Sequence, residues 1–243
     1  MTSTRRMFVR SAIGVAAAAT AGSLLTDTAF ADTPPPPGRL STAGAARAQR
    51  DAARVQPGAR SANGWTVNTA SDAGGSVWTR PIPGTGCEVQ VAIGDVEIIL
   101  VHCVRRFHYE IESLRPGDVV GFKSPGTVKG HASNHASGTA LDIRPGSYPP
   151  GVRGGFHPYQ VDVIRDILAE CDGVVTWGGD FRIPDEAHFE IGLAPADPRV
   201  HRLADKLRDW RINRPGQGAG VLVDPMNAAR RAAALTLART QAA

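Results

Sequence analysis

Two histidines and one aspartate lie close together in the segment HASNHASGTALD, which covers residues 131–142 and otherwise consists mostly of small residues. Imidazole nitrogens and carboxylate oxygens are metal ligands, and zinc binds both at about 2 Å. If His135 and Asp142 lay on one helix, their separation of seven residues would place them roughly 10 Å apart along the axis, too far for one ion. The chain must therefore bend between them. The run at 137–139 is the expected place, because its glycine can adopt backbone angles that other residues avoid.

The choice between the two histidines depends on the residues that separate them. His131 and His135 are four residues apart, a spacing that would also suit two ligands on one helix face. The run between them is a poor helix former, because Ser133 and Asn134 compete for backbone hydrogen bonds. It also lacks the glutamate that zinc-helix proteases carry there. We therefore predict that His135, and not His131, pairs with Asp142 in a metal site.

A third ligand and a catalytic carboxylate are expected in WGGDFRIPDEAHFE, residues 177–190. The end of this segment alternates as a strand does, so that His188 and Glu190 share one face. His188 can then point toward Asp142 on a neighbouring strand, while Glu190 either orients His188 or forms a salt bridge in solvent. Asp185 lies in the turn before the strand. It could reach a water molecule on the metal without being a ligand.

Both segments resemble the motifs of one enzyme family. Residues 133–142 match the pattern SxHxxGxAxD and residues 185–188 match (D/E)xxH, as in the zinc peptidoglycan peptidases of the D-alanyl-D-alanine carboxypeptidase (VanY-type) and L-alanyl-D-glutamate endopeptidase family. The resemblance covers about residues 85–193. It implies that Asp185 is the catalytic base. The residues that it would make ligands of a Zn²⁺ ion are His135, Asp142 and His188.

The resemblance also implies a fold and an activity. The fold would be α+β, with a small, mostly antiparallel sheet, flanking helices and the zinc site on the sheet face, as in Hedgehog and D-Ala-D-Ala peptidases. The activity would be hydrolysis of peptide bonds in peptidoglycan stem peptides by zinc-activated water, of the D-Ala-D-Ala carboxypeptidase or the L-Ala-D-Glu endopeptidase type. Three protein ligands leave a fourth position open, as catalytic zinc requires. The alternative is a non-catalytic, zinc-stabilised module that binds the cell wall, which would have no need of Asp185.

The chain departs from the family pattern upstream of these motifs. Many members have a GYRS-like segment whose arginine is thought to assist substrate or transition-state binding. The nearest match here is Gly121-Phe122-Lys123-Ser124, and a lysine does not offer the planar fork of arginine. Lys123 and Ser133 are candidate substrate-binding residues, although Ser133 would equally suit a hydrogen bond that shapes its loop.

A β-hairpin is predicted over residues 87–103, with its turn at 94–96. This register would set Cys87 opposite Cys103 on one face, and a disulfide between them would be allowed in an exported protein. The third cysteine, Cys171, would remain a buried thiol.

Hydrophobic periodicity and turn residues predict the other elements as well. One helix is expected over about 104–114, and a second begins near Pro158 and ends at Gly173. Asp197-Pro198 and Asp224-Pro225 both indicate capped helix starts, and the last helix has no clear core face. The predicted strands cover residues 117–122, 139–143, 174–177 and 188–191.

The first 31 residues resemble a twin-arginine export signal. Arg5 and Arg6 precede an uncharged run at 11–26, and Ala29-Phe30-Ala31 fits a small-x-small cleavage pattern. The uncharged run is shorter than the about 20 apolar residues of a membrane span. The mature protein is therefore expected to be extracellular or associated with the cell wall, without a stable membrane span.

The remaining chain divides by composition into a Pro/Ala-rich linker at 32–62, a zinc peptidase domain at 63–212 and a basic tail at 213–243. Residues 63–198 hold ten basic and seventeen acidic side chains, so the central segment is acidic and its flanks are basic. A nucleic-acid-binding core would carry positive charge on the folded domain itself, and we therefore predict no nucleic-acid partner. The basic flanks either favour an anionic wall polymer or are solvated tails.

Overall fold

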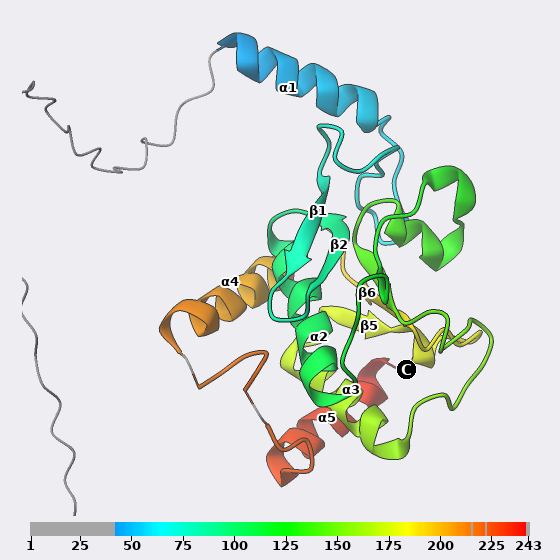
Figure 1. Ribbon diagram of the computed structural model, residues 1–243, viewed down its shortest axis with the longest axis vertical. Helices are drawn as coiled ribbons and strands as arrows, with labels where there is room; N and C mark the ends of the chain where they lie inside the picture. Colours follow the sequence, from blue (N-terminus) through cyan, green and yellow to red (C-terminus); the bar gives the residue numbers. More distant parts are fainter. Residues whose placement is uncertain (1–41, 215, 222, 242–243) are drawn as a thin grey trace, which may run out of the picture. The chain divides into compact units, whose positions relative to one another are not determined.

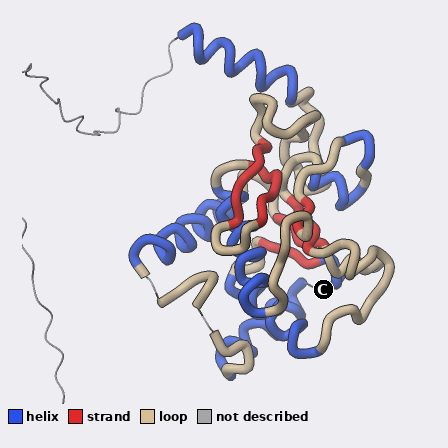
Figure 2. The backbone as a smooth tube through the Cα atoms, in the orientation of Figure 1, coloured by secondary structure: helices blue, strands red, loops and turns tan. Residues whose placement is uncertain are grey.

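The computed structural model describes residues 42–214, 216–221 and 223–241. The predicted export signal at 1–31 and the first part of the predicted linker lie outside these residues. The fold class is confirmed as α+β, with two small antiparallel sheets and helices around them (Figures 1 and 2). Among the helices of the described residues, none combines the length and the apolar character needed to cross a membrane.

The predicted hairpin at 87–103 is wrong. Strand β2 (Cys87–Ala92) pairs instead with the preceding strand β1 (Val77–Ile82), and residues Asp95–Glu110 form helix α2. The helical alternative prevails because buried side chains recur at helical spacing and acidic side chains occupy the first turn, next to the positive end of the helix dipole. The buried apolar residues of α2 are Val96, Ile99, Leu100, Cys103, Val104 and Phe107.

The predicted pairing of Cys87 with Cys103 fails together with the hairpin. Cys87 begins β2 opposite Ile82, whereas Cys103 lies on α2, and all three cysteines are free and buried. The sulfur closest to Cys103 belongs to Cys171, at a Sγ–Sγ distance of 3.6 Å.

The second sheet carries the predicted strands in the order β3-β4-β6-β5. Its strands are β3 (Val119–Val120), β4 (Ala140–Ile143), β6 (His188–Ile191) and β5 (Val175–Trp177). The strand expected over 117–122 is thus shortened to two residues. Leu141 pairs with Phe189 across β4 and β6, and both enter the apolar core with α2, whereas Asp142 pairs with His188 on the alternate positions. One face of the sheet is therefore core and the other is polar.

The remaining helices are α1 (Thr42–Val55), α3 (Pro158–Glu170), α4 (Pro198–Asn213) and α5 (Ala228–Gln241). Helix α1 occupies much of the segment that was expected to be a flexible linker. Helices α4 and α5 contact α2 and α3 respectively (Figure 1). The last helix was expected to lack a core face and to begin at Asp224-Pro225. It begins later, with Asn227 accepting hydrogen bonds from the first turn, and it buries Ala234.

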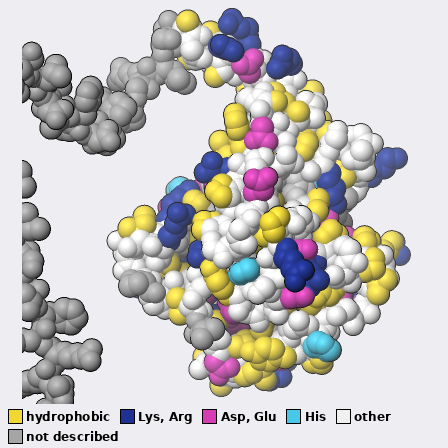
Figure 3. Space-filling view, viewed as in Figure 1, with side chains coloured by type: hydrophobic (Ala, Val, Ile, Leu, Met, Phe, Trp, Pro, Cys, Tyr) yellow, Lys and Arg dark blue, Asp and Glu magenta, His cyan; other side chains and the backbone are white. Residues whose placement is uncertain are grey.

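Basic side chains on the face shown in Figure 3 form small, separate groups, and one of these lies over α1. The arginines of α1 are Arg47, Arg50 and Arg54. On this face the positive charge is not gathered into one continuous surface.

A buried ion cluster joins α2 to α3 on the side of the fold that faces away from the polar sheet face. Arg106, only 1% exposed, donates hydrogen bonds to Glu110, Asp166 and Glu170 at 2.5–2.9 Å. His102 contacts the same oxygen of Glu170 at 2.8 Å. Burial alone would raise the pKa of Glu170, but the hydrogen bond from His102 and the charge of Arg106 outweigh it and lower that pKa to about 2. Removing one member of such a cluster leaves buried charges unpaired.

We predict that Glu170→Gln lowers the free energy of unfolding at pH 7 by an amount on the order of 2–3 kcal/mol. The pKa of Glu170 falls from its ordinary 4.5 to about 2 on folding. Its contribution is therefore complete above pH 4.5 and is lost as the pH falls toward 2. Urea denaturation at several pH values should show the difference between wild type and variant shrinking over this window. Glu88→Gln, on an exposed side chain, serves as control; a difference for Glu170→Gln that does not change with pH would contradict the assignment.

Candidate metal centre

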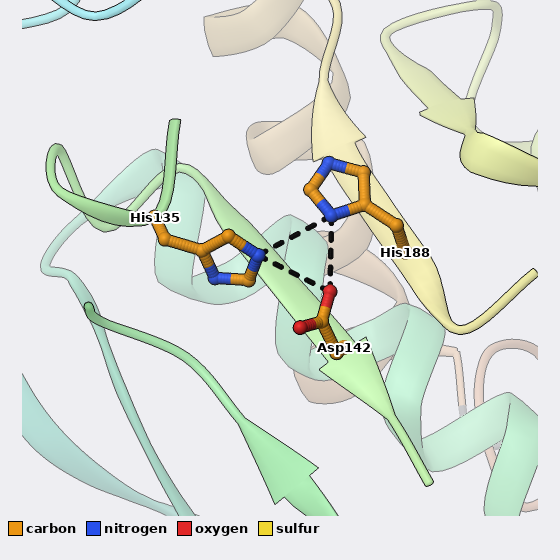
Figure 4. Close-up of side chains that lie close together, drawn as sticks. All are labelled: His135, Asp142 and His188. Carbon is orange, nitrogen blue, oxygen red and sulfur yellow. Dashed lines mark hydrogen bonds and ion pairs between the residues drawn. The ribbon is translucent and has the colours of Figure 1, made fainter. Parts of the chain in front are cut away.

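Three predicted side chains converge on one point at the polar face of the sheet (Figure 4). His135 Nε2 lies 3.1 Å from Asp142 Oδ1, and His188 Nδ1 lies 3.0 Å from the same oxygen. The two nitrogens are 3.3 Å apart. All three residues are buried, with exposures of 1% to 4%. One ligand atom from each residue lies within 4.8 Å of the other two, close enough for the three to hold one metal ion.

Strand register and a tight turn bring these residues together. Asp142 on β4 stands directly opposite His188 on β6. His135 ends a short 3₁₀ helix, Gly130–His135, so the run after His131 is not α-helical, as its composition indicates. The expected bend follows at Gly138, where φ is +67°. A Cβ there would lie 2.6 Å from the backbone nitrogen of Ala92, so a glycine is also required by the close approach to β2.

Each imidazole is oriented by a hydrogen bond from its second nitrogen. His135 Nδ1 lies 2.5 Å from the carbonyl oxygen of Gly121, and His188 Nε2 lies 2.9 Å from Glu190 Oε2. A carbonyl oxygen can only accept, so His135 donates from Nδ1, and the carboxylate of Glu190 favours the same role for His188 Nε2. The orienting role that the sequence allowed for Glu190 is thus realised. Such partners fix the tautomer and orientation of metal-ligating histidines.

A second polar side chain continues this network and could not be foreseen from the motifs. Asn134, which is fully buried, donates from Nδ2 to Glu190 Oε2 at 2.7 Å and accepts from the backbone of Asn63 at 3.1 Å. Asn134 occupies the first x of the SxHxxGxAxD pattern, a position where the pattern accepts any residue. The only available signal was an amide side chain directly before the predicted ligand His135.

The donor set fits a cation. In their neutral form, with the outer nitrogens donating elsewhere, His135 Nε2 and His188 Nδ1 would turn lone pairs toward each other and toward a carboxylate oxygen. Without a metal ion, protons between these atoms relieve the repulsion. Burial would raise the pKa of Asp142, but hydrogen bonds from the two histidines lower it below its ordinary value. Burial would lower the pKa of His188, but the carboxylates of Asp142 and Glu190 raise it to about 9. Both shifts show that the centre favours positive charge, which a divalent metal ion can supply in place of protons.

Asp185 lies beside this group in the turn before β6. Its Oδ1 is buried and has no hydrogen-bond partner among the described residues. Burial raises its pKa, and the nearby charge of Asp142 raises it further. An unpartnered buried carboxylate oxygen is rare in folded proteins and calls for a partner such as water or a ligand.

The turn that carries Asp185 is held rigidly. The carboxylate of Glu186, the next residue, accepts the backbone N–H groups of Gly154 and Gly155 at 2.7 and 2.8 Å. The indole of Trp177 donates to the carbonyl oxygen of Glu186 at 2.8 Å. These contacts tie the turn to the long loop at 144–157, which Figure 2 shows without helix or strand.

The two candidate substrate residues differ in their positions. Lys123 Nζ lies 2.5 Å from Asp142 Oδ2, so the lysine reaches the centre and its side chain is about one-third exposed, at 35%. Ser133 Oγ accepts a hydrogen bond from the backbone of Ala62 at 2.9 Å, which is the loop-shaping contact that the sequence left open. The side chain of His131 lies outside the described residues.

Comparison with known proteins supports the resemblance that the motifs indicate. Residues 127–191 match a family described as D-alanyl-D-alanine carboxypeptidase. The match includes His135, Asp142, Asp185 and His188. No curated protein and no solved structure matches the chain. This match supports the suspected peptidase family over residues 127–191.

We predict that His135→Ala lowers the affinity for a divalent metal ion by more than about 100-fold, because removing a ligand should exceed the 10–100-fold cost of removing an orienting partner. His131→Ala is the matched control and should retain full metal content. Titration of the metal-free protein with Zn²⁺, followed by calorimetry, gives both affinities. A metal-depleted His131→Ala protein would contradict the choice between the two histidines.

Proposed function

We propose that this chain is an exported zinc metallopeptidase that hydrolyses peptide bonds in peptidoglycan stem peptides. The observation that carries the proposal is the convergence of His135 Nε2, Asp142 Oδ1 and His188 Nδ1 beside Asp185, whose Oδ1 has no hydrogen-bond partner among the described residues. The family match supports the class of enzyme. The twin-arginine and cleavage patterns of the first 31 residues support export.

Zinc suits this donor set better than magnesium or calcium. Two imidazole nitrogens and one carboxylate oxygen are typical of catalytic zinc, whereas the harder cations prefer oxygen ligands throughout. Three protein ligands leave an open coordination position, which a purely structural zinc site does not. Zinc bound there would lower the pKa of a water molecule and polarise the carbonyl group of the scissile bond.

Asp185 is the group that can move the proton. As the water attacks, Asp185 accepts its proton on the carboxylate, and it then delivers that proton to the amine that leaves. Oδ1 is available for this role because no donor among the described residues occupies it. The raised pKa strengthens Asp185 as a base relative to an ordinary exposed carboxylate. Its rigid turn keeps the oxygen in position through both transfers.

Lys123 supplies positive charge at the opposite side of Asp142. Its ammonium group reaches Asp142 Oδ2, next to the oxygen that faces the two histidines. A substrate carbonyl that binds at this centre would develop negative charge on its oxygen within reach of that ammonium group. The same position in many family members carries an arginine, and a lysine can act there as a point charge without the bidentate fork.

We predict that Asp185→Asn retains zinc and loses hydrolysis by about 10²–10⁴-fold, the usual contribution of a general acid–base group. Zinc-loaded wild type and variant are incubated with purified muropeptides, and the products are followed by mass spectrometry. The mass that is lost identifies the bond that is cut. Asp180→Asn is the matched control, because Asp180 pairs with Arg165 on α3.

Two outcomes of this experiment would overturn the assignment. If Asp185→Asn lost zinc, Asp185 would be a ligand or a structural residue rather than the base. If the zinc-loaded wild type left every muropeptide mass unchanged, the non-catalytic wall-binding module would be the better explanation.

We predict that Lys123→Met lowers kcat by about 10²–10³-fold with zinc content retained, as expected for loss of one charge at a developing oxyanion. Lys123→Arg should restore part of the rate, because it keeps the charge. The measurement is the hydrolysis rate alongside the zinc stoichiometry of each variant. If Lys123→Met instead lost zinc, the lysine would serve mainly to hold Asp142.

A further inference from the structure

Two buried cysteines that the proposed activity does not use lie in contact with each other. Cys103 on α2 and Cys171 at the end of α3 are 68 positions apart in the sequence, yet their sulfurs are 3.6 Å apart. Their exposures are 1% and 0%. Cys87, the third cysteine, lies on β2, where its sulfur contacts the carbonyl oxygen of Thr85.

We propose that Cys103 and Cys171 form a disulfide bond when the chain folds in the presence of a small-molecule disulfide as oxidant. The sulfurs must approach each other by about 1.6 Å to reach the S–S bond length of about 2.0 Å. Rotation of the two side chains and a slight shift between α2 and α3 can supply this. Among the described residues, the group that could hold a metal ion does not include either cysteine, and the two sulfurs contact each other.

The reaction is a two-electron oxidation. One thiolate of the pair attacks oxidised glutathione, which gives a mixed disulfide and releases one glutathione thiol. The second thiolate of the pair then displaces the other glutathione thiol and closes the S–S bond. Two protons and two electrons pass from the protein thiols to the glutathione disulfide. No other reagent is required.

The native packing limits when this reaction can occur. The contact with Cys103, together with burial, raises the pKa of Cys171, so that few thiolates exist in the closed structure. An oxidant also cannot reach a side chain with no exposed surface. Oxidation therefore proceeds while the contact between α2 and α3 is still open, as it is during folding, and is slow in the folded reduced protein.

The bond would close a loop between residues 103 and 171 and would join α2 to the end of α3. A disulfide across a long loop stabilises mainly by restricting the unfolded chain. For a chain of this size we expect the melting temperature to rise by roughly 5–15 °C on oxidation.

The test compares the full chain refolded with a mixture of oxidised and reduced glutathione and the same chain refolded with dithiothreitol. Each sample is denatured without reductant, labelled with a maleimide and weighed by mass spectrometry. The oxidised protein should carry one label, on Cys87, and the reduced protein three, one for each cysteine. Proteolysis without reduction should give one linked peptide pair that contains Cys103 and Cys171.

Alanine variants show which cysteines form the bond and cause the rise in melting temperature. Cys87→Ala should keep both the linkage and the rise in melting temperature on oxidation. Cys103→Ala and Cys171→Ala should each abolish that rise. Three labels on the oxidised wild type, or a linkage that includes Cys87, would overturn the proposal. Because both results are read from the wild-type chain, they stand even if an alanine variant fails to fold.

Discussion

The antiparallel pairing of β4 with β6 is the constraint on which the rest of the structure depends. It sets Asp142 opposite His188 and, on alternate positions, Leu141 opposite Phe189. The apolar pair packs against α2, and the polar pair faces the metal centre. A slip of one residue would exchange the two faces, burying ionisable groups among apolar side chains without partners. The apolar face thus decides which side chains lie on the metal face, and the observed register sets Asp142 directly opposite His188 on it.

Burial of so many polar groups is tolerated because most of them are connected to a partner, Asp185 Oδ1 beside the metal centre being an exception. On the metal face, Asn134, Glu190 and His188 form a chain of hydrogen bonds that ends at Asp142. On the helix side, Arg106 gathers three carboxylates. The two networks differ in one respect. The helix cluster contains its own cations, because Arg230 joins Arg106 in contacting Asp166 and Glu170. On the metal face, neutral imidazoles would leave two lone pairs and a carboxylate oxygen directed at one another. Such an arrangement is stable only with protons or a cation at its centre, so the site is organised for an ion before the ion arrives.

The sequence predicts the metal face well because strand alternation and the glycine bend are local signals. His135, Asp142 and His188 meet as expected for that reason. Residues 95–103 were predicted as a strand because a run rich in apolar residues fits strand and helix patterns alike. The predicted pairing of Cys87 with Cys103 failed because it depended on that strand. Helix α1 was missed because proline and glycine in the preceding chain outweighed the helix preference of its alanines. The contact of Lys123 with Asp142 depends on how the loop after β3 approaches β4 in space, and no local pattern encodes it.

The centre is assembled from two segments that strand pairing brings side by side. His135, Asp142 and Lys123 precede Cys171 in the sequence, whereas Asp185 and His188 follow it. A metal ion joins the two segments directly, because its ligands come from both. A bond between Cys103 and Cys171 would act elsewhere, on the contact of α2 with α3 behind the sheet. Since α2 supports the apolar faces of β4 and β6, fixing that contact steadies the platform from which the ligands project without touching them. The two constraints are therefore complementary: the ion sets the geometry of the centre, and the helices behind the sheet set how firmly that geometry is held.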